Sequence, residues 1–114
     1  MATSYCTAFV TVPNREKADE LAQKLVKRKL AACVNIVPGI SSVYWWEGKV
    51  EKAEELLLLC KTRLSLVAEL TEFVRKNHPY KIPEVIAIGI EDGNKDYLNW
   101  LGANAPFGKN QPST

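Results

Sequence analysis

Apolar and polar positions in the first part of the chain follow the pattern of a β-strand and then a helix. Residues 5–12 are rich in β-branched and aromatic side chains, and Pro13 ends the strand because proline has no N–H for a ladder hydrogen bond. Asn14 is placed to cap a helix. Apolar residues then recur at helical spacing as far as Leu30, which predicts a helix that packs along one stripe.

Residues 31–62 contain two extended apolar runs on either side of a turn that includes Gly48. No helical period interrupts these runs, so they predict a long two-stranded ribbon. The dipeptide Pro38-Gly39 predicts a bend or a bulge in the first strand. A ribbon this apolar exceeds what one short chain can bury, which indicates a partner surface.

The rest of the chain repeats the order of a helix and a strand. Residues 64–77 have helical periodicity with Ser65 as a plausible cap, and His78-Pro79 ends this helix. Residues 84–90 form an apolar strand, and a short helix follows Gly93-Asn94. The order β-α-β-β-α-β plus a small helix predicts an α+β protein with the ferredoxin-like split β-α-β arrangement. Its sheet is antiparallel, with both main helices on one face.

The last predicted strand is apolar on both sides. Ile86 and Ile88 point to one face of the sheet, and Val85 and Ala87 point to the other. Two helices on one face leave the opposite face without cover, although a strand of this kind is normally covered on both sides. We therefore expect the open face to meet another subunit in a homo-oligomer.

Length and composition favour one domain without extended charged surfaces. Of the 114 residues, we assign 1–103 to a single domain and 104–114, rich in Pro, Gly and Asn, to a disordered tail. The 15 Lys and Arg residues are interspersed with 13 Asp and Glu residues, so no nucleic acid partner is expected. No apolar run approaches the ~20 residues that a membrane-spanning helix needs, so no membrane insertion is expected.

The cysteines and the N-terminus suggest an intracellular protein. Cys6, Cys33 and Cys60 fit neither a disulfide framework nor a CxxC-type metal motif, so reduced thiols are the simpler interpretation. The chain enters its first strand almost at once, which leaves no room for a signal peptide. We expect a cytoplasmic location, unless an N-terminal extension supplies an organellar or secretory address.

Soft-metal binding is the sharpest chemical hypothesis that the residues allow. Cys33 and His78, the single histidine, offer a thiolate and an imidazole, which suit copper(I) or zinc. The alternatives are that Cys33 is a small buried hydrophobe and that His78 hydrogen-bonds a backbone carbonyl. One histidine and the absence of GxSxG, HExxH and Gly-rich phosphate motifs leave no catalytic constellation, so we expect no enzyme.

Several ordered motifs, taken together, resemble the CutA family, which is named for tolerance to divalent cations. The resemblance covers roughly residues 5–102. The motifs that carry it are LAACVN (30–35), Pro38, SVY (42–44), WEGK (46–49), Glu55, KT (61–62), HPY (78–80), PE (83–84), GN (93–94), Tyr97, Leu98 and Trp100.

The resemblance implies a ferredoxin-like protomer in a tight homotrimer and a role in divalent-metal tolerance, with copper as the usual cofactor and no catalysis. It also implies two alternatives, a PII-like sensor of a small molecule in clefts between subunits and a scaffold that anchors another protein. Carried over to this chain, it places the metal ligands at Cys33 and His78. The residues that it places near a cleft are Glu55, Lys61, Tyr80 and Trp100.

Overall fold

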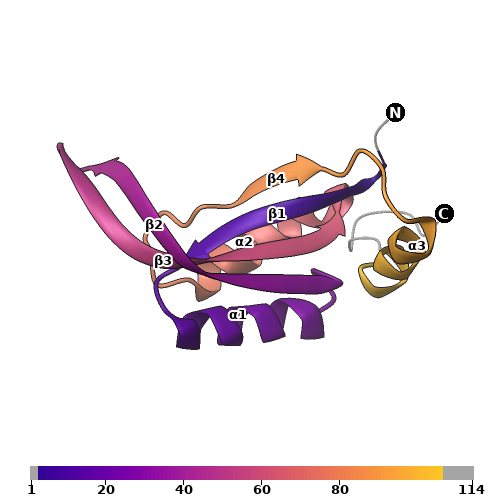
Figure 1. The fold of residues 1–114 in the computed structure, drawn as a ribbon. Helices are drawn as coiled ribbons and strands as arrows, with labels where there is room; N and C mark the ends of the chain where they lie inside the picture. Colours follow the sequence, from indigo (N-terminus) through magenta and orange to yellow (C-terminus); the bar gives the residue numbers. More distant parts are fainter. Residues whose placement is uncertain (1–2, 107–114) are drawn as a thin grey trace.

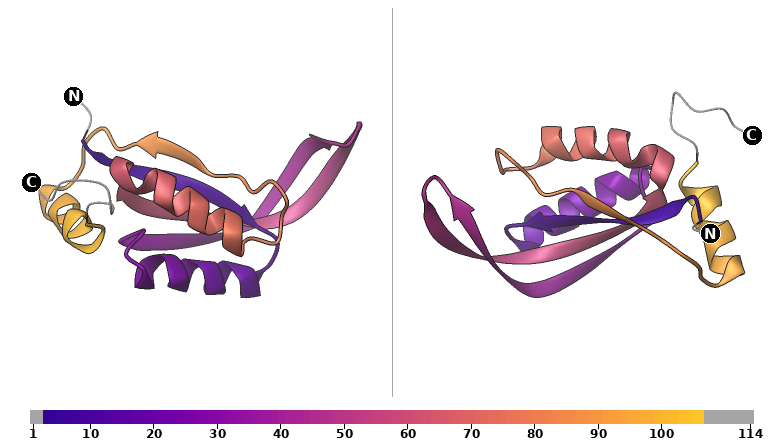
Figure 2. Two further views of the ribbon diagram at one scale, coloured as in Figure 1. Left: turned by 180° about the vertical axis from the view of Figure 1, so that it is seen from behind. Right: turned by 90° about the horizontal axis from the view of Figure 1, so that it is seen from above.

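The computed structural model describes residues 3–106, which form a four-stranded antiparallel sheet with two helices on one face (Figures 1 and 2). The strand order is β2-β3-β1-β4. This confirms the predicted α+β class and the antiparallel sheet. In chain order the elements are β1 (Tyr5–Val12), α1 (Arg15–Lys27), β2 (Cys33–Trp46), β3 (Lys49–Arg63), a 3₁₀ turn (Leu64–Leu66), α2 (Val67–Asn77), β4 (Ile86–Gly89) and α3 (Lys95–Asn104).

The two main helices begin in different ways. The Asn14 side chain accepts a hydrogen bond from the Lys17 amide at 2.8 Å, which confirms Asn14 as the cap of α1. The predicted cap at Ser65 is wrong. The chain first makes the 3₁₀ turn, so α2 starts only at Val67, and Leu66 occupies the cap position without a side-chain hydrogen bond.

The core lies between the sheet and the helices α1 and α2, which Figure 2 shows on the same side of the sheet. Val10 of β1 lies opposite Leu58 of β3, and both side chains are fully buried. Alternate residues of these strands face the helices, as the period of two requires. Leu25 of α1 and Leu70 of α2 fill the same cluster.

The other face of the sheet is apolar and no helix of the described chain covers it (Figure 2). Phe9 of β1 lies opposite both Leu59 of β3 and Ile86 of β4, so these three side chains share this open face. Thr7 lies opposite Ile88 in the same way. Ile86 and Ile88 are each about half exposed, which agrees with the open face expected from the sequence. The strand β4 itself is shorter than the predicted span of 84–90.

The strands β2 and β3 continue past the sheet as a two-stranded ribbon, which projects at the left of Figure 1. A register shift between Val37 and Ile40 confirms the predicted irregularity at Pro38-Gly39. The turn at the tip places Glu47 and Gly48 at positive φ, the backbone that tight two-residue hairpins favour. We call residues 33–37 and 56–63 the inner half of the ribbon, and residues 40–46 and 49–55 its outer half.

The third helix, α3, closes the opposite end of the sheet and is held by Arg63. The Arg63 guanidinium donates hydrogen bonds to the carbonyls of Ala105 at 2.7 Å and Gly102 at 2.9 Å, and it lies over the Tyr5 ring. Because α3 runs to Asn104 and Ala105 is buried, the packed chain continues just past the predicted domain end at 103. The remainder of the predicted disordered tail, 107–114, lies outside the described residues.

Candidate functional site

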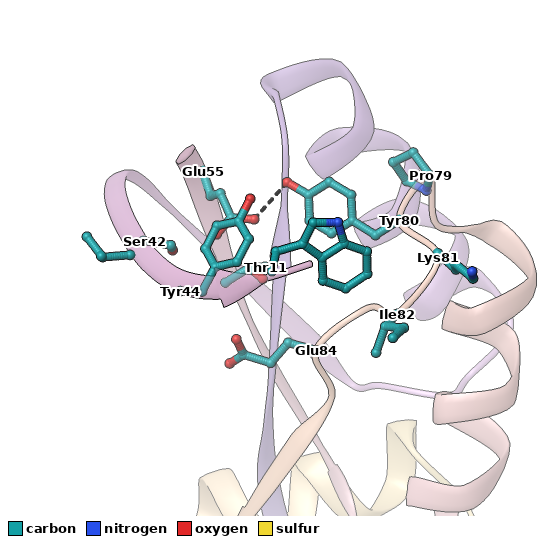
Figure 3. A pocket seen from close by; sticks show the side chains of 11 residues that line it. Thr11, Ser42, Tyr44, Glu55, Pro79, Tyr80, Lys81, Ile82 and Glu84 are labelled. Atoms are coloured by element: carbon teal, nitrogen blue, oxygen red, sulfur yellow. Dashed lines mark hydrogen bonds between the residues drawn. The ribbon is translucent and has the colours of Figure 1, made fainter. Parts of the chain in front are cut away.

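A hydrogen-bonded carboxylate and phenol lie where the outer half of the ribbon meets the sheet. The Tyr80 hydroxyl, from the loop after α2, donates to Glu55 Oε2 on β3 at 2.7 Å (Figure 3). Glu55 is only 7% exposed. Burial, and next the hydrogen bond to Glu55, raise the pKa of Tyr80 well above its ordinary value. The phenol therefore stays protonated and continues to donate to Glu55 throughout the neutral range.

His78 is held beside this pair by both of its ring nitrogens. The Tyr80 amide donates to Nδ1 at 3.1 Å, so the ring proton sits on Nε2, which donates to the Thr11 carbonyl at 2.7 Å. The His78 and Tyr80 rings also pack at a centroid distance of 4.8 Å. His78 thus bonds a backbone carbonyl, as one of the alternatives above proposes, and must release one hydrogen bond before it can bind a metal ion.

A cavity of about 660 Å³ opens next to the Glu55–Tyr80 pair, between the outer half of the ribbon and the loop that follows α2. Aromatic rings and two carboxylates, Glu55 and Glu84, line it. Tyr44 lines the same cavity as these carboxylates, and Figure 3 shows Lys81 directed away from both of them. We call this cavity the ribbon pocket. Its lining residues are Thr11, Ser42, Val43, Tyr44, Trp46, Glu55, Pro79, Tyr80, Lys81, Ile82 and Glu84.

Cys33 lies at the other end of the sheet, at the start of β2. It is opposite Lys61 of β3, whose ammonium donates to the Asn35 side chain. Burial, and next the nearby Cys33 thiol, raise the pKa of Tyr97 on α3. Trp100 packs against Tyr97 at a ring distance of 5.5 Å. The structure therefore groups Cys33 and Trp100 around α3, with Lys61 beside Cys33.

The two predicted metal ligands of one chain are too far apart to share an ion. Cys33 is opposite Lys61, Lys61 is opposite Thr7, and His78 contacts Thr11, four residues further along β1. Four strand residues span about 13 Å, whereas two ligands of one ion lie within about 4 Å of each other. Within residues 3–106, no three His, Cys, Asp or Glu residues are placed to hold a metal ion. A site that uses both Cys33 and His78 needs two chains.

The other two cysteines are part of the core. Cys6 and Cys60 are fully buried on the face that the helices cover. Burial raises the pKa of Cys60 to about 12 and also raises that of Cys6. Such thiols are poor metal ligands because they rarely ionise.

The sequence analysis did not place Glu84, Tyr44 and Trp46 beside Glu55. The alternation of β2 contained part of the signal, since Tyr44 and Trp46 fall on one face of the strand. The register then pairs Tyr44 with Glu51, four residues from Glu55 on the same face of β3. The approach of the loop that carries Tyr80 and Glu84 depends on tertiary packing.

Residues 6–104 match the family model described as CutA1 divalent ion tolerance protein. The chain belongs to this family. Within residues 3–106, no helix of this CutA1 family member is long and apolar enough to cross a membrane.

The chain is similar in sequence to CutA proteins from both a plant and a bacterium. The chain is 60% identical over 93 residues to "Protein CutA 1, chloroplastic" of Oryza sativa subsp. japonica, an alignment that covers 82% of this chain and 52% of the rice protein. It is 50% identical over 96 residues to "Divalent-cation tolerance protein CutA" of Thermus thermophilus, which covers 84% of this chain and 93% of that protein.

The fold is also that of a solved relative. The crystal structure of CutA1 from Oryza sativa superimposes with a TM-score of 0.88 at 53% identity, and the match covers 92% of this chain and 96% of that one. The chain spans about half the length of the full rice protein.

Proposed function

We propose that this CutA1 family member acts in divalent-cation tolerance as a homotrimer of ferredoxin-like protomers and binds copper, or another divalent metal ion, between its chains. Catalysis is not part of this role. Membership of a family described by divalent ion tolerance supports the general role. The observation that supports a metal site between chains is the position of Cys33 on the open face of the sheet.

The open face supports the assembly. Ile86 and Ile88 are half exposed on it. Separately from this face, the outer half of the ribbon exposes Val43, Trp45 and Val50, which are each at least 64% exposed. Burial of apolar surface gains about 25 cal/mol per Å², so a few hundred Å² contributes several kcal/mol to association. Apolar side chains of this size are rarely left in water over so large a part of a small domain.

Cys33 lies on the same face as these exposed isoleucines. Cys33 is opposite Lys61, Lys61 is opposite Thr7, and Thr7 is opposite Ile88, so all four side chains project to one side. Contact between open faces therefore places the Cys33 thiol at or near the boundary between chains. There a His78 imidazole from a second chain can complete a thiolate and imidazole pair, which suits copper(I).

Copper(I) titration against a chromophoric chelator tests this role in the full chain. We expect Cys33→Ala and His78→Ala each to weaken copper(I) binding by at least about tenfold. Cys60→Ala, which removes a fully buried thiol, is the matched control and leaves the affinity unchanged. Equal affinity of wild type and both ligand variants would eliminate the proposed site.

A PII-like sensor of a small molecule is the second candidate, and one observation favours it. The ribbon pocket, at about 660 Å³, has the volume of a typical small-ligand site, about 300–1,000 Å³. Thermal-shift screening with nucleotides and metabolites separates the two candidates. A response to metal ions alone argues against the sensor.

A cytoplasmic location remains a prediction from the sequence. The rice relative carries the word chloroplastic in its name, so relatives in other compartments exist. A C-terminal fluorescent fusion to the complete natural protein, viewed beside compartment markers, tests the location directly.

A further inference from the structure

We infer that a groove between α1 and α2 docks an acidic segment of a partner protein. The groove has a volume of about 930 Å³. We call it the helix groove. It is lined by Lys24, Lys27 and Arg28 on the side of α1 and by Glu69, Glu72 and Phe73 on the side of α2. The inference goes beyond the proposed metal role and depends on neither Cys33 nor the ribbon pocket.

The helix groove lies on the side of the sheet away from the open face. α1 and α2 cover one face of the sheet, as Figure 2 shows, and the groove is on their outer surface, where Lys24, Lys27 and Glu72 are exposed. Chains that meet through their open faces leave these helices on the outside of the assembly. The groove therefore stays outside the surfaces that we propose other protomers cover.

Basic side chains outnumber acidic ones in the groove, by four to two. Glu72 is engaged by Arg75 at 3.1 Å and by Lys76, which also lines the groove, at 3.8 Å. Within residues 3–106, Lys27 and Arg28 form no ion pair with a carboxylate. The whole chain has 15 basic and 13 acidic residues, so its excess of two positive charges equals that of the groove. The rest of the chain is neutral on balance, and the groove attracts anionic groups.

Arg28 is held in place through both its side chain and its backbone. Its guanidinium lies over the Phe73 ring, 4.9 Å from the ring centre. The end of α1 fixes the backbone here, because Lys29 has positive φ and the Leu30 amide donates to the Leu25 carbonyl at 2.9 Å. A guanidinium held in this way loses less conformational freedom on binding, and its planar N–H fork matches a carboxylate.

The arrangement of charges favours a protein segment over a nucleic acid. Lys24, Lys27 and Arg28 lie in the last turn of α1 and at its end, whereas Glu69 and Glu72 lie on α2. A nucleic acid carries a phosphate at every residue, so it would bring phosphates against the two glutamates. A protein segment can present carboxylates to α1 and neutral or basic side chains to α2.

Several carboxylates are needed, because each contact in the groove is weak by itself. Lys24 and Arg28 are exposed and lie about 6 Å apart along the helix axis. An exposed ion pair contributes only about 0.2–1 kcal/mol. A segment with several acidic side chains meets these bases at the same time, which a single small carboxylate cannot do.

An NMR titration of the isotope-labelled, full-length protein tests the inference. The two probes are a capped tetraglutamate peptide and the matched tetraglutamine peptide, which have nearly the same shape but differ in charge. We expect tetraglutamate to bind at least about tenfold more tightly at low salt, because several weak ion pairs add up. The backbone amide signals of residues 24–28 and 72–77 report whether binding occurs in the groove.

Two arginines of α1 provide a matched pair of variants. Arg28→Gln removes the charge that is held against Phe73, and we expect it to weaken tetraglutamate binding by about fivefold. Arg15→Gln is the control. Arg15 lies in the first turn of α1, about 20 Å from Arg28, and pairs with Asp19 at 3.7 Å, so its loss leaves the affinity within about twofold.

The outcomes separate an acidic protein segment from other anions. Equal binding of tetraglutamate and tetraglutamine overturns the inference. So does binding of N-acetylglutamate amide as tightly as tetraglutamate, which would indicate a site for one small anion. Tighter binding of a thymidine oligonucleotide of the same charge would indicate a nucleic acid and also overturn it. If Arg28→Gln does not fold, the comparison of the two peptides on the wild type still decides.

Sedimentation equilibrium with and without saturating tetraglutamate checks that the groove is free in the assembly. We expect the mass of the wild type to stay the same apart from the bound peptide. A fall to lower mass would show that the groove belongs to a contact between chains, and it would overturn the inference. Copper(I) binding is not affected by any of these outcomes, so the metal proposal is tested separately.

Discussion

The inner and outer halves of the ribbon belong to the same two strands, yet their side chains have opposite surroundings. In the inner half, Leu58 and Cys60 are fully buried beneath the helices. In the outer half, Val43 is 66% exposed, Trp45 71% and Val50 64%. Both halves carry large apolar side chains, so what distinguishes these side chains is whether a second layer covers them.

This contrast shows what can be inferred from an apolar pattern along a strand. The pattern indicates how much surface the strand must bury, but the layer that covers this surface can come from the same chain or from another. α1 and α2 provide that layer for one face of the inner half. The outer half has no such cover among the described residues, which is why we propose that other protomers provide it.

The largest expected effect comes from a change in the inner half. Leu58→Ala removes a fully buried side chain between the sheet and the helices. We expect the free energy of unfolding to fall by about 2–5 kcal/mol, because the cavity closes only in part. Urea unfolding at one fixed protein concentration measures the change. Val50→Ala in the outer half is the comparison, and a loss as large as that of Leu58→Ala would remove the distinction between the two halves.

The buried Cys60 makes the stability of the inner half depend on pH. Burial raises its pKa from 9.0 to about 12, so the unfolded chain releases this proton at a lower pH than the folded chain does. The stabilisation is complete below pH 9 and is lost as the pH rises from 9 towards 12. By pH 11 the loss amounts to roughly 2–3 kcal/mol. The pH dependence of urea unfolding, wild type minus Cys60→Ala, isolates this contribution, and parallel curves would contradict it.

Substitutions at two glycines test the two ends of the ribbon: Gly102 of α3 packs against the inner end, and Gly48 lies in the turn at the tip. A Cβ at Gly102 would run into the Tyr5 hydroxyl and come within 2.9 Å of the Arg63 guanidinium, so Gly102→Ala disturbs the contact between α3 and the inner half. We expect a cost of about 1–2 kcal/mol. Gly48→Ala at the tip meets no atom but is strained by its positive φ, with an expected cost of about 1 kcal/mol. Thermal unfolding measures both costs. Near-ultraviolet circular dichroism distinguishes the two variants, since only Gly102→Ala disturbs the packing of an aromatic side chain, that of Tyr5.

An effect as small as that of Gly102→Ala is expected for the hydrogen bond where the two halves meet. Tyr80→Phe removes the donor to the buried Glu55 carboxylate. We expect a loss of about 1–2 kcal/mol in the free energy of unfolding, because the carboxylate loses its partner. Tyr44→Phe, whose ring is 44% exposed, serves as the control and changes less than about 0.5 kcal/mol. Equal changes in the two variants would show that the bond to Glu55 contributes nothing.

Local patterns in the sequence were enough to predict most of the elements. The period of two predicted the strands, the period of 3.6 predicted the helices, and Asn14 was correctly identified as a cap. Ser65 was not, because a 3₁₀ turn shifted the start of α2 by a few residues. The length of β4 was overestimated because hydrophobicity does not specify where ladder pairing with β1 stops.

The candidate site was less accessible from the sequence. Glu55 and Tyr80 were named by resemblance to a family, but their hydrogen bond joins residues 25 positions apart and depends on how the loop after α2 folds back. The separation of Cys33 from His78 follows from strand register and was not evident from residue types alone. Whether Cys33 and His78 meet across chains depends on the assembly. The pattern of one chain indicates this assembly only through the apolar surface that it leaves uncovered.

Sedimentation equilibrium tests the central claim that the open face and the outer half of the ribbon are covered by other copies of the chain. At about 10 μM the wild type should have three times the mass of one chain. A Val43→Ser, Trp45→Ser double variant, which removes two of the most exposed apolar side chains, should shift to lower mass and keep the circular dichroism of a folded protein. A wild-type mass equal to that of one chain would contradict the account.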